Sequence, residues 1–250
     1  MYHQVIGMGL ISIFVLSPCI GKVDSFSTGG HTVYHLRPAT VESGERVVIS
    51  TTYDGFVLCN RRDGQMLWKT SIDGHFPFDM AVSDIDHDGH DETMVVTAAG
   101  KLYTVDDSGE ILWVFDKTAP LFQVCTAKLD NGSTVILTGG VEQILYVLSS
   151  KGRLLGSIKT KHVIRHLRVG DICGEGHDYA AVATTNRGLS GTLSLLLIDP
   201  ANRKVEIVLQ HLKGTWCVDI LSGQALPIEN GRIHVTVPMG TLRIVDIEHQ

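Results

Sequence analysis

The stretch Val82-Ser-Asp-Ile-Asp-His-Asp-Gly-His-Asp-Glu92 joins a hydrophobic lead-in to a turn in which Asp residues alternate before a glycine. A β-like run that starts at Met94 follows it. The same order of lead-in, Asp- and Gly-containing turn and β run recurs three more times downstream. Such self-similarity indicates a repeat protein, in which each unit buries its apolar face against its neighbours.

Five β-rich segments fall into register around these turns: 47–52, 94–99, 135–140, 180–185 and 234–239. Their starts lie about 40 to 55 residues apart, which is the size of one four-stranded propeller blade. A tight turn and a second alternating run follow each segment, and a third run follows in most units. We assign the strand that leads into each acidic turn as the fourth of its unit.

The sequence therefore predicts an all-β protein, a β-propeller of four-stranded antiparallel blades with four full units and a partial fifth. The approximate unit bounds are 45–90, 91–134, 135–179, 180–232 and 233–250.

Composition excludes some classes of function. The chain of 250 residues is 44% hydrophobic and 19% charged, which is typical of a folded globular protein. Its formal charge of -6 provides no basic surface for nucleic acid, so we expect no nucleic-acid partner.

Residues 1–21 have the form of a signal peptide. The apolar run 5–16 is as long as the hydrophobic core of an export signal and too short to span a bilayer comfortably. No Lys or Arg precedes this run, so a buried first strand and a misassigned start are alternatives. Leu16-Ser-Pro-Cys19 also resembles a lipoprotein cleavage box, although Pro18 fits that pattern poorly. We expect an extracytoplasmic protein, periplasmic, cell-surface or secreted, without a transmembrane span in residues 22–250.

Four cysteines outside this leader lie far apart in four different units: Cys59, Cys125, Cys173 and Cys217. A disulfide needs Cα atoms about 4.4–6.8 Å apart, which neighbouring blades rarely provide. We expect buried free thiols, and no Cys-x-x-Cys pair supports zinc.

Two motifs resemble known repeat families. Asp63-Gly-Gln-Met-Leu-Trp68 and Ser108-Gly-Glu-Ile-Leu-Trp113 resemble the repeat of quinoprotein-type, or PQQ-like, propellers. The 84–92 turn resembles the FG-GAP and VCBS repeats of integrin-type propellers. The resemblance implies a parent propeller of seven or eight blades, of which this chain is a part. The alternative is a five-blade ring completed by residues 29–36, and an open ring would leave strand edges exposed.

The acidic turn is the sharpest chemical feature of the sequence. Calcium takes six to eight oxygen ligands at about 2.3–2.6 Å. We expect ligands at turn positions one, three, five, seven and nine: Asp84, Asp86, Asp88, the backbone carbonyl of His90, and Glu92. An EF-hand is excluded, because its position twelve is Val95 and no helix flanks it. The alternative is an acidic turn whose Asp side chains cap backbone N–H groups.

Other candidate groups have simpler interpretations. Trp68 and Trp113 occupy equivalent strand positions, which favours packing between blades over a stacking platform. His162 and His166 on a strand would lie about 13 Å apart, too far for one ion. We find no nucleophile elbow and no phosphate-binding glycine loop.

These observations favour an exported, non-catalytic propeller that binds a protein or carbohydrate ligand and carries one structural calcium loop. The alternatives are enzymes: part of a propeller-type polysaccharide lyase, or a quinoprotein dehydrogenase. PQQ is not expected, because the chain has no adjacent cysteine pair.

Overall fold

The protein is described from a computed structural model. The described backbone covers residues 10–13, 24–129, 131–160, 162–171, 178–185, 191–198, 205–209, 216–219, 225–227, 229, 233–237 and 242–247. Side chains are described for 25–129, 131–160, 162–171, 178–185, 227 and 229. Every regular element in these ranges is a β-strand, so the predicted all-β class is confirmed. Within the same ranges no helix is long and apolar enough to cross a membrane.

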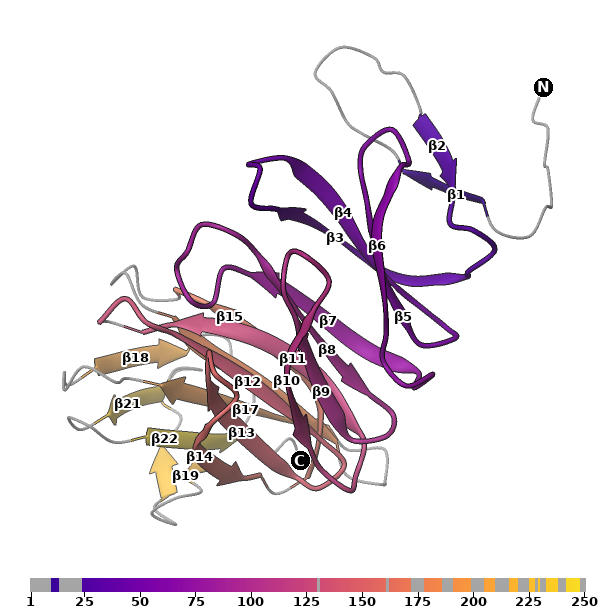
Figure 1. Ribbon diagram of the computed structural model, residues 1–250. Helices are drawn as coiled ribbons and strands as arrows, with labels where there is room; N and C mark the ends of the chain where they lie inside the picture. Colours follow the sequence, from indigo (N-terminus) through magenta and orange to yellow (C-terminus); the bar gives the residue numbers. More distant parts are fainter. Residues whose placement is uncertain are drawn as a thin grey trace, which may run out of the picture. The chain divides into compact units, whose positions relative to one another are not determined.

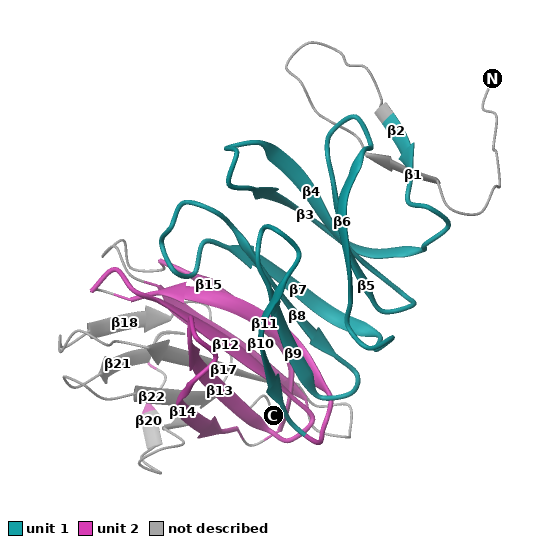
Figure 2. Ribbon diagram, in the orientation of Figure 1, with its two compact units in different colours: residues 1–117 teal, residues 118–250 magenta. Residues whose placement is uncertain are grey.

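The chain divides into two compact units, residues 1–117 and 118–250 (Figure 2). Unit 1 begins with a two-stranded antiparallel pair and continues with two four-stranded sheets (Figure 1). The pair consists of β1 (Leu10–Ile13) and β2 (Asp24–Ser27). The first sheet consists of β3 (Val33–Thr40), β4 (Arg46–Thr52), β5 (Phe56–Asn60) and β6 (Met66–Ser71). The second consists of β7 (Pro77–Ser83), β8 (Glu92–Thr97), β9 (Lys101–Val105) and β10 (Ile111–Asp116).

Unit 2 opens with a third sheet of the same kind. It consists of β11 (Leu121–Lys128), β12 (Thr134–Gly140), β13 (Ile144–Ser149) and β14 (Leu154–Lys159). A six-stranded sheet follows, in the order β15-β16-β17-β22-β19-β20, and β18 pairs with β21. These strands are β15 (Val163–Gly170), β16 (Tyr179–Thr185), β17 (Gly191–Ile198), β18 (Val205–Leu209), β19 (Trp216–Asp219), β20 (Ala225–Pro227), β21 (Ile233–Val237) and β22 (Leu242–Ile247).

Consecutive antiparallel pairing of four strands is the arrangement of a propeller blade, which confirms the predicted fold. The phase of the repeat differs from the prediction. The strand before the acidic turn, β7, pairs with β8 and is the first strand of its sheet, not the fourth of the preceding one. The three later sheets, which begin with β7, β11 and β15, therefore take their first strand from the end of the preceding predicted unit, while the first sheet takes β3 from before residue 45.

The prediction was also wrong about strand partners after residue 198. The expected third strand of the fourth unit, β18, pairs with β21, while β17 pairs with β22. The two runs expected as a hairpin in 233–250 therefore pair with other strands. A physical reason lies in the connection 199–204, which contains Pro200 and no glycine. Tight hairpin turns favour Asn-Gly or Gly at the positions of positive φ, and here Asn202 has no glycine after it, so the connection specifies pairing of its flanking strands only weakly.

The leader prediction is tested only in part. Residues 1–9 and 14–23 lie outside the described residues, and Leu10–Ile13 forms a strand paired with Asp24–Ser27. The signal peptide therefore stays a prediction.

In both units the core lies between adjacent sheets. In unit 1 it contains Ala39, Val47, Ile49, Val57, Cys59, Ile72, Met80, Val95 and Tyr103. Trp68 packs beside this core, and its indole N–H donates to the Asp107 carbonyl oxygen of the next sheet at 2.8 Å. Gly109 lies so close under the indole that an added Cβ would come within 2.7 Å of Trp68 Cδ2. Trp68 therefore packs between sheets, as its repeated position predicts.

Candidate functional site

The acidic turn between β7 and β8 gathers three of the predicted ligands. Asp84, Asp86 and Asp88 each place a carboxylate oxygen so that all three oxygens lie within 4.8 Å of one another. The turn is held by its own backbone, because the Asp84 carboxylate accepts N–H groups of His87 at 2.6 Å and Gly89 at 3.0 Å. His87 and Gly89 both adopt positive φ, at 68° and 96°, which curls the loop around the carboxylates.

Glu92 lies under this turn, at the start of β8, and is almost fully buried. Its carboxylate accepts the Ile85 N–H at 2.9 Å. Burial raises the pKa of Glu92 to about 7, and the nearby negative charges of Asp86, Asp88 and Asp84 add to the shift. The fifth predicted ligand, His90, lies in the same turn, where its N–H donates to Asp88 at 2.8 Å.

These residues fit a hard divalent cation in their chemistry. Four carboxylates lie close enough for mutual repulsion to raise the pKa of the buried one, and a bound cation would remove that repulsion. The same carboxylates also cap backbone N–H groups, as the alternative interpretation of the sequence predicts. The geometry is compatible with both interpretations, so the calcium site remains a prediction.

Asp91, inside the turn, has a role that the sequence interpretation missed. Its carboxylate accepts the Thr40 N–H at 2.7 Å, and its own N–H donates to the Thr40 carbonyl at 2.9 Å. Thr40 ends β3, so Asp91 fastens the second sheet to the first strand of the preceding one. Asp178 does the same in unit 2, with Lys128 N–H at 2.7 Å and Lys128 carbonyl at 2.9 Å. The tripeptide Gly-His-Asp occurs at both 89–91 and 176–178, and this repetition in the sequence points to a shared role of Asp91 and Asp178.

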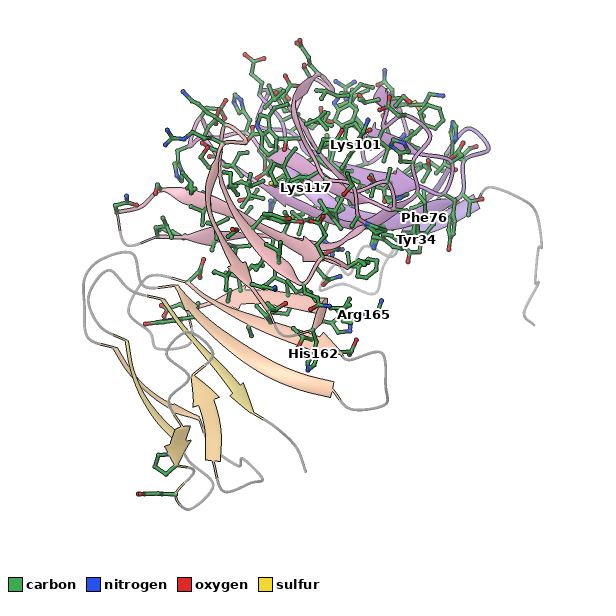
Figure 3. The ribbon with its side chains drawn as sticks, turned by 90° about the horizontal axis from the view of Figure 1, so that it is seen from below. Tyr34, Phe76, Lys101, Lys117, His162 and Arg165 are labelled. Atoms are coloured by element: carbon green, nitrogen blue, oxygen red, sulfur yellow. The ribbon has the colours of Figure 1, made fainter. Side chains whose placement is uncertain are left out.

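A cluster of aromatic side chains occupies the opposite edge of unit 1. Tyr34, at the start of β3, contacts Tyr53 and Phe76 with ring centroids 4.9 Å apart in both pairs. Tyr53 and Phe76 are 5.4 Å apart, and Phe78 on β7 packs edge-on against Phe76 at 5.4 Å. Figure 3 shows Tyr34 and Phe76 next to one another. This edge lies about 20 Å along the strands from the acidic turn, given a rise of 3.3 Å per residue.

Three polar side chains follow the cluster along the first strands of the two sheets. His35 and Arg37 lie two residues apart on β3, and Asp79 lies on β7. Burial lowers the pKa of His35, the Asp79 carboxylate opposes that shift, and the Arg37 guanidinium adds to it. The three groups are therefore within electrostatic reach of one another.

Comparison with known proteins identifies the family. The model of the lambda-carrageenase β-propeller domain matches residues 47–183, more than half of the chain. The chain belongs to this family. The model of the lambda-carrageenase C-terminal domain matches residues 193–248, the part in which strand pairing departs from the blade order.

Two curated relatives of this propeller are lambda-carrageenases, one from Pseudoalteromonas sp and one from Pseudoalteromonas carrageenovora. Each is 26% identical over 213 residues, which is 83% of this chain. The matched region is 21% of either relative, so the chain spans about a fifth of the length of these enzymes.

Solved structures support the fold alone. BBS1N in complex with ARL6DN is similar with a TM-score of 0.54 and 16% identity, over 90% of this chain and 69% of that one. The computationally designed Ika8 protein gives 0.51 and 17%, over 96% and 69%. The Neurospora crassa Pan2 WD40 domain gives 0.50 and 13%, over 85% and 68%.

The family assignment changes the interpretation of the sequence in two ways. The β-propeller is supported, but the PQQ-like and FG-GAP or VCBS repeat types are not confirmed. The predicted non-catalytic scaffold gains no support from these relatives, which are themselves named lambda-carrageenases.

Proposed function

We propose that this chain is the propeller-containing part of a polysaccharide-degrading enzyme, and that it binds the galactan chain on which the enzyme acts. The observation that carries this proposal is the family match over residues 47–183, together with the carrageenase relatives aligned over 83% of the chain.

Substrate chemistry favours hydrolysis over the elimination reaction of a lyase. Elimination requires a uronic acid, whose carboxyl group acidifies the neighbouring C5 proton. A carrageenan is a sulfated galactan and has no such carboxyl group. We therefore propose a hydrolase, and the lyase version of the sequence-based alternative is set aside.

The test is a binding experiment with the 250-residue chain. Its mobility would be measured in native gels cast with lambda-carrageenan, with agarose oligosaccharides as a neutral galactan, and with no polymer. We expect retardation in the lambda-carrageenan gel alone. Equal mobility in all three gels would contradict the proposal that this part of the enzyme binds substrate.

We also propose that the acidic turn binds one structural Ca²⁺ through Asp84, Asp86, Asp88, the His90 carbonyl and Glu92. The convergence of three carboxylate oxygens within 4.8 Å supports this, together with the buried fourth carboxylate beneath them. A bound ion would supply positive charge that stabilises the link between β7 and β8.

Calcium titration by calorimetry and thermal melting test this site. We expect binding and a calcium-dependent rise in Tm in the wild type, and the loss of both in Asp86→Ala. Asp63→Ala is the matched control, because Asp63 caps only its own turn, accepting the Gln65 N–H at 2.9 Å. A wild type without either effect would show that the turn is held by backbone caps alone.

We propose, finally, that the protein is exported, since a polymeric substrate is met outside the cell. The apolar run 5–16 supports this. Expression of the gene in its host, followed by N-terminal sequencing of the extracytoplasmic protein, would test it. A protein confined to the cytoplasm with an intact N-terminus would contradict it.

A further inference from the structure

The aromatic cluster of Tyr34, Tyr53, Phe76 and Phe78, defined above, keeps two of its rings accessible to solvent. Tyr34 is 40% exposed and Tyr53 is 51% exposed, whereas Phe76 and Phe78 are half-buried beneath them. The four side chains come from the start of β3, the turn after β4, and the start of β7. The rings are tilted by 52° to 79° to one another, which gives a rigid support with exposed ring surface.

A repeated backbone device positions these side chains. The pairing of β3 with β4 shifts register between Val33 and His35, which makes Tyr34 a bulged residue. The pairing of β7 with β8 shifts in the same way at Phe78.

Unit 2 repeats the device at Phe122 of β11 and Arg165 of β15. There the Arg165 guanidinium carbon lies 4.9 Å from the centroid of the Phe122 ring, and Figure 3 labels Arg165. A bulge disrupts the hydrogen-bond ladder locally and re-aims one side chain, and bulges are over-represented at sheet edges and next to active sites.

The groups next to the cluster suit a hydroxyl-rich, anionic ligand. His35 follows Tyr34 directly, and Arg37 lies on the same strand and is exposed. Arg37 can hold a planar anion such as a sulfate group, and Asp79 and His35 can bond to hydroxyl groups. Ligand sites in general combine apolar contact surface with a few polar groups that fix orientation.

We propose that this aromatic cluster is a sugar-binding subsite, in which Tyr34 and Tyr53 stack on a pyranose ring of the galactan while His35 and Arg37 contact its hydroxyl and sulfate groups. This inference rests on the proposed function, because it names the residues that would hold the polysaccharide. It also places the polymer at the edge of unit 1 opposite the acidic turn.

The test measures the Kd of a lambda-carrageenan oligosaccharide by calorimetry for four forms of the 250-residue chain. They are the wild type, Tyr34→Ala/Tyr53→Ala, Tyr34→Phe/Tyr53→Phe, and Leu154→Ala/Leu155→Ala. The last is matched in exposed apolar surface, since Leu154 and Leu155 are 45% and 48% exposed. Tyr53→Ala alone repeats the test with the more exposed ring should the double variant lose its melting transition. Sedimentation velocity gives the oligomeric state of each form.

We expect Tyr34→Ala/Tyr53→Ala to raise Kd by roughly tenfold or more, because two stacking surfaces are lost. The Phe and Leu variants should keep the wild-type Kd. Unchanged affinity in the Ala variant would overturn the subsite and leave the proposed function standing. A wild type that binds no oligosaccharide would overturn both. A wild-type dimer that the Ala variant breaks, with affinity unchanged, would show that a second copy covers the cluster and would also overturn the subsite.

Discussion

Replacing Asp91 by Ala removes the carboxylate that joins the two sheets of unit 1. The lost contact is the 2.7 Å hydrogen bond from Thr40 N–H, while the 2.9 Å bond from Asp91 N–H to the Thr40 carbonyl depends on backbone alone. A hydrogen bond to a charged group contributes about 1.5–3 kcal/mol, and here the Thr40 donor is left without its partner. For a chain of this size about 2 kcal/mol corresponds to a fall in Tm of roughly 4 to 8 °C.

Urea denaturation and thermal melting in EDTA would measure the effect without any contribution from bound metal. Asp91→Asn should lie between wild type and Asp91→Ala, because an amide oxygen still accepts the N–H. Asp63→Ala is the control, since the Asp63 carboxylate is exposed and caps only its own turn, and we expect it to cost under about 1 kcal/mol. If Asp91→Ala is no more destabilising than Asp63→Ala, the carboxylate does not link the sheets and the argument for Asp178 falls as well.

Three further predictions follow from single sites. Gly109→Ala should destabilise by about 1–3 kcal/mol more than Gly44→Ala in urea denaturation, because both glycines have positive φ but only Gly109 would drive a Cβ into Trp68; equal losses would refute the contact. Cys59 is fully buried, and burial raises its pKa to about 12, so iodoacetamide at about pH 8.5 should label this thiol only in urea. Mass spectrometry of the peptide that contains Cys59 would show this, and rapid labelling of the folded protein would contradict it. Burial lowers the pKa of His35 below 6.5, so the folded state binds that proton less readily than the unfolded state, and the free energy of unfolding should fall as pH drops below about 6.5. In urea titrations, His35→Gln should flatten this dependence of unfolding free energy on pH, and an unchanged dependence would contradict the prediction.

The blades could be predicted because their signals are local. Alternating apolar runs such as 94–99, joined by glycine turns at positive φ such as Gly100, specify strands and hairpins within a few residues. The partner of a strand is not a local property. Short loops connect β7 both to β6 of the first sheet and to β8, so its sequence alone does not reveal that it pairs with β8. After residue 198 the strands pair with distant partners, although Gly240 lies in the short connection between β21 and β22, so a glycine in a connection does not by itself decide the pairing.

The site shows the same division. Alternate Asp residues around Gly89 predict converging carboxylates, and three of them do converge. Asp91 was missed because its partner, Thr40, lies 51 residues earlier in the chain. The aromatic cluster was missed because Tyr34, Tyr53 and Phe76 come from three separate segments of the chain. Unlike Trp68 and Trp113, they do not occupy equivalent positions in successive units.

Hydrogen–deuterium exchange of the 250-residue chain, with and without lambda-carrageenan oligosaccharide, tests most directly the claim that this propeller binds a galactan at its aromatic edge. The account predicts slower exchange in peptides that contain 32–37, 53–56 and 75–79 when the oligosaccharide is present. It predicts no change across 84–92. Protection confined to the acidic turn, or no protection in unit 1, would contradict the account.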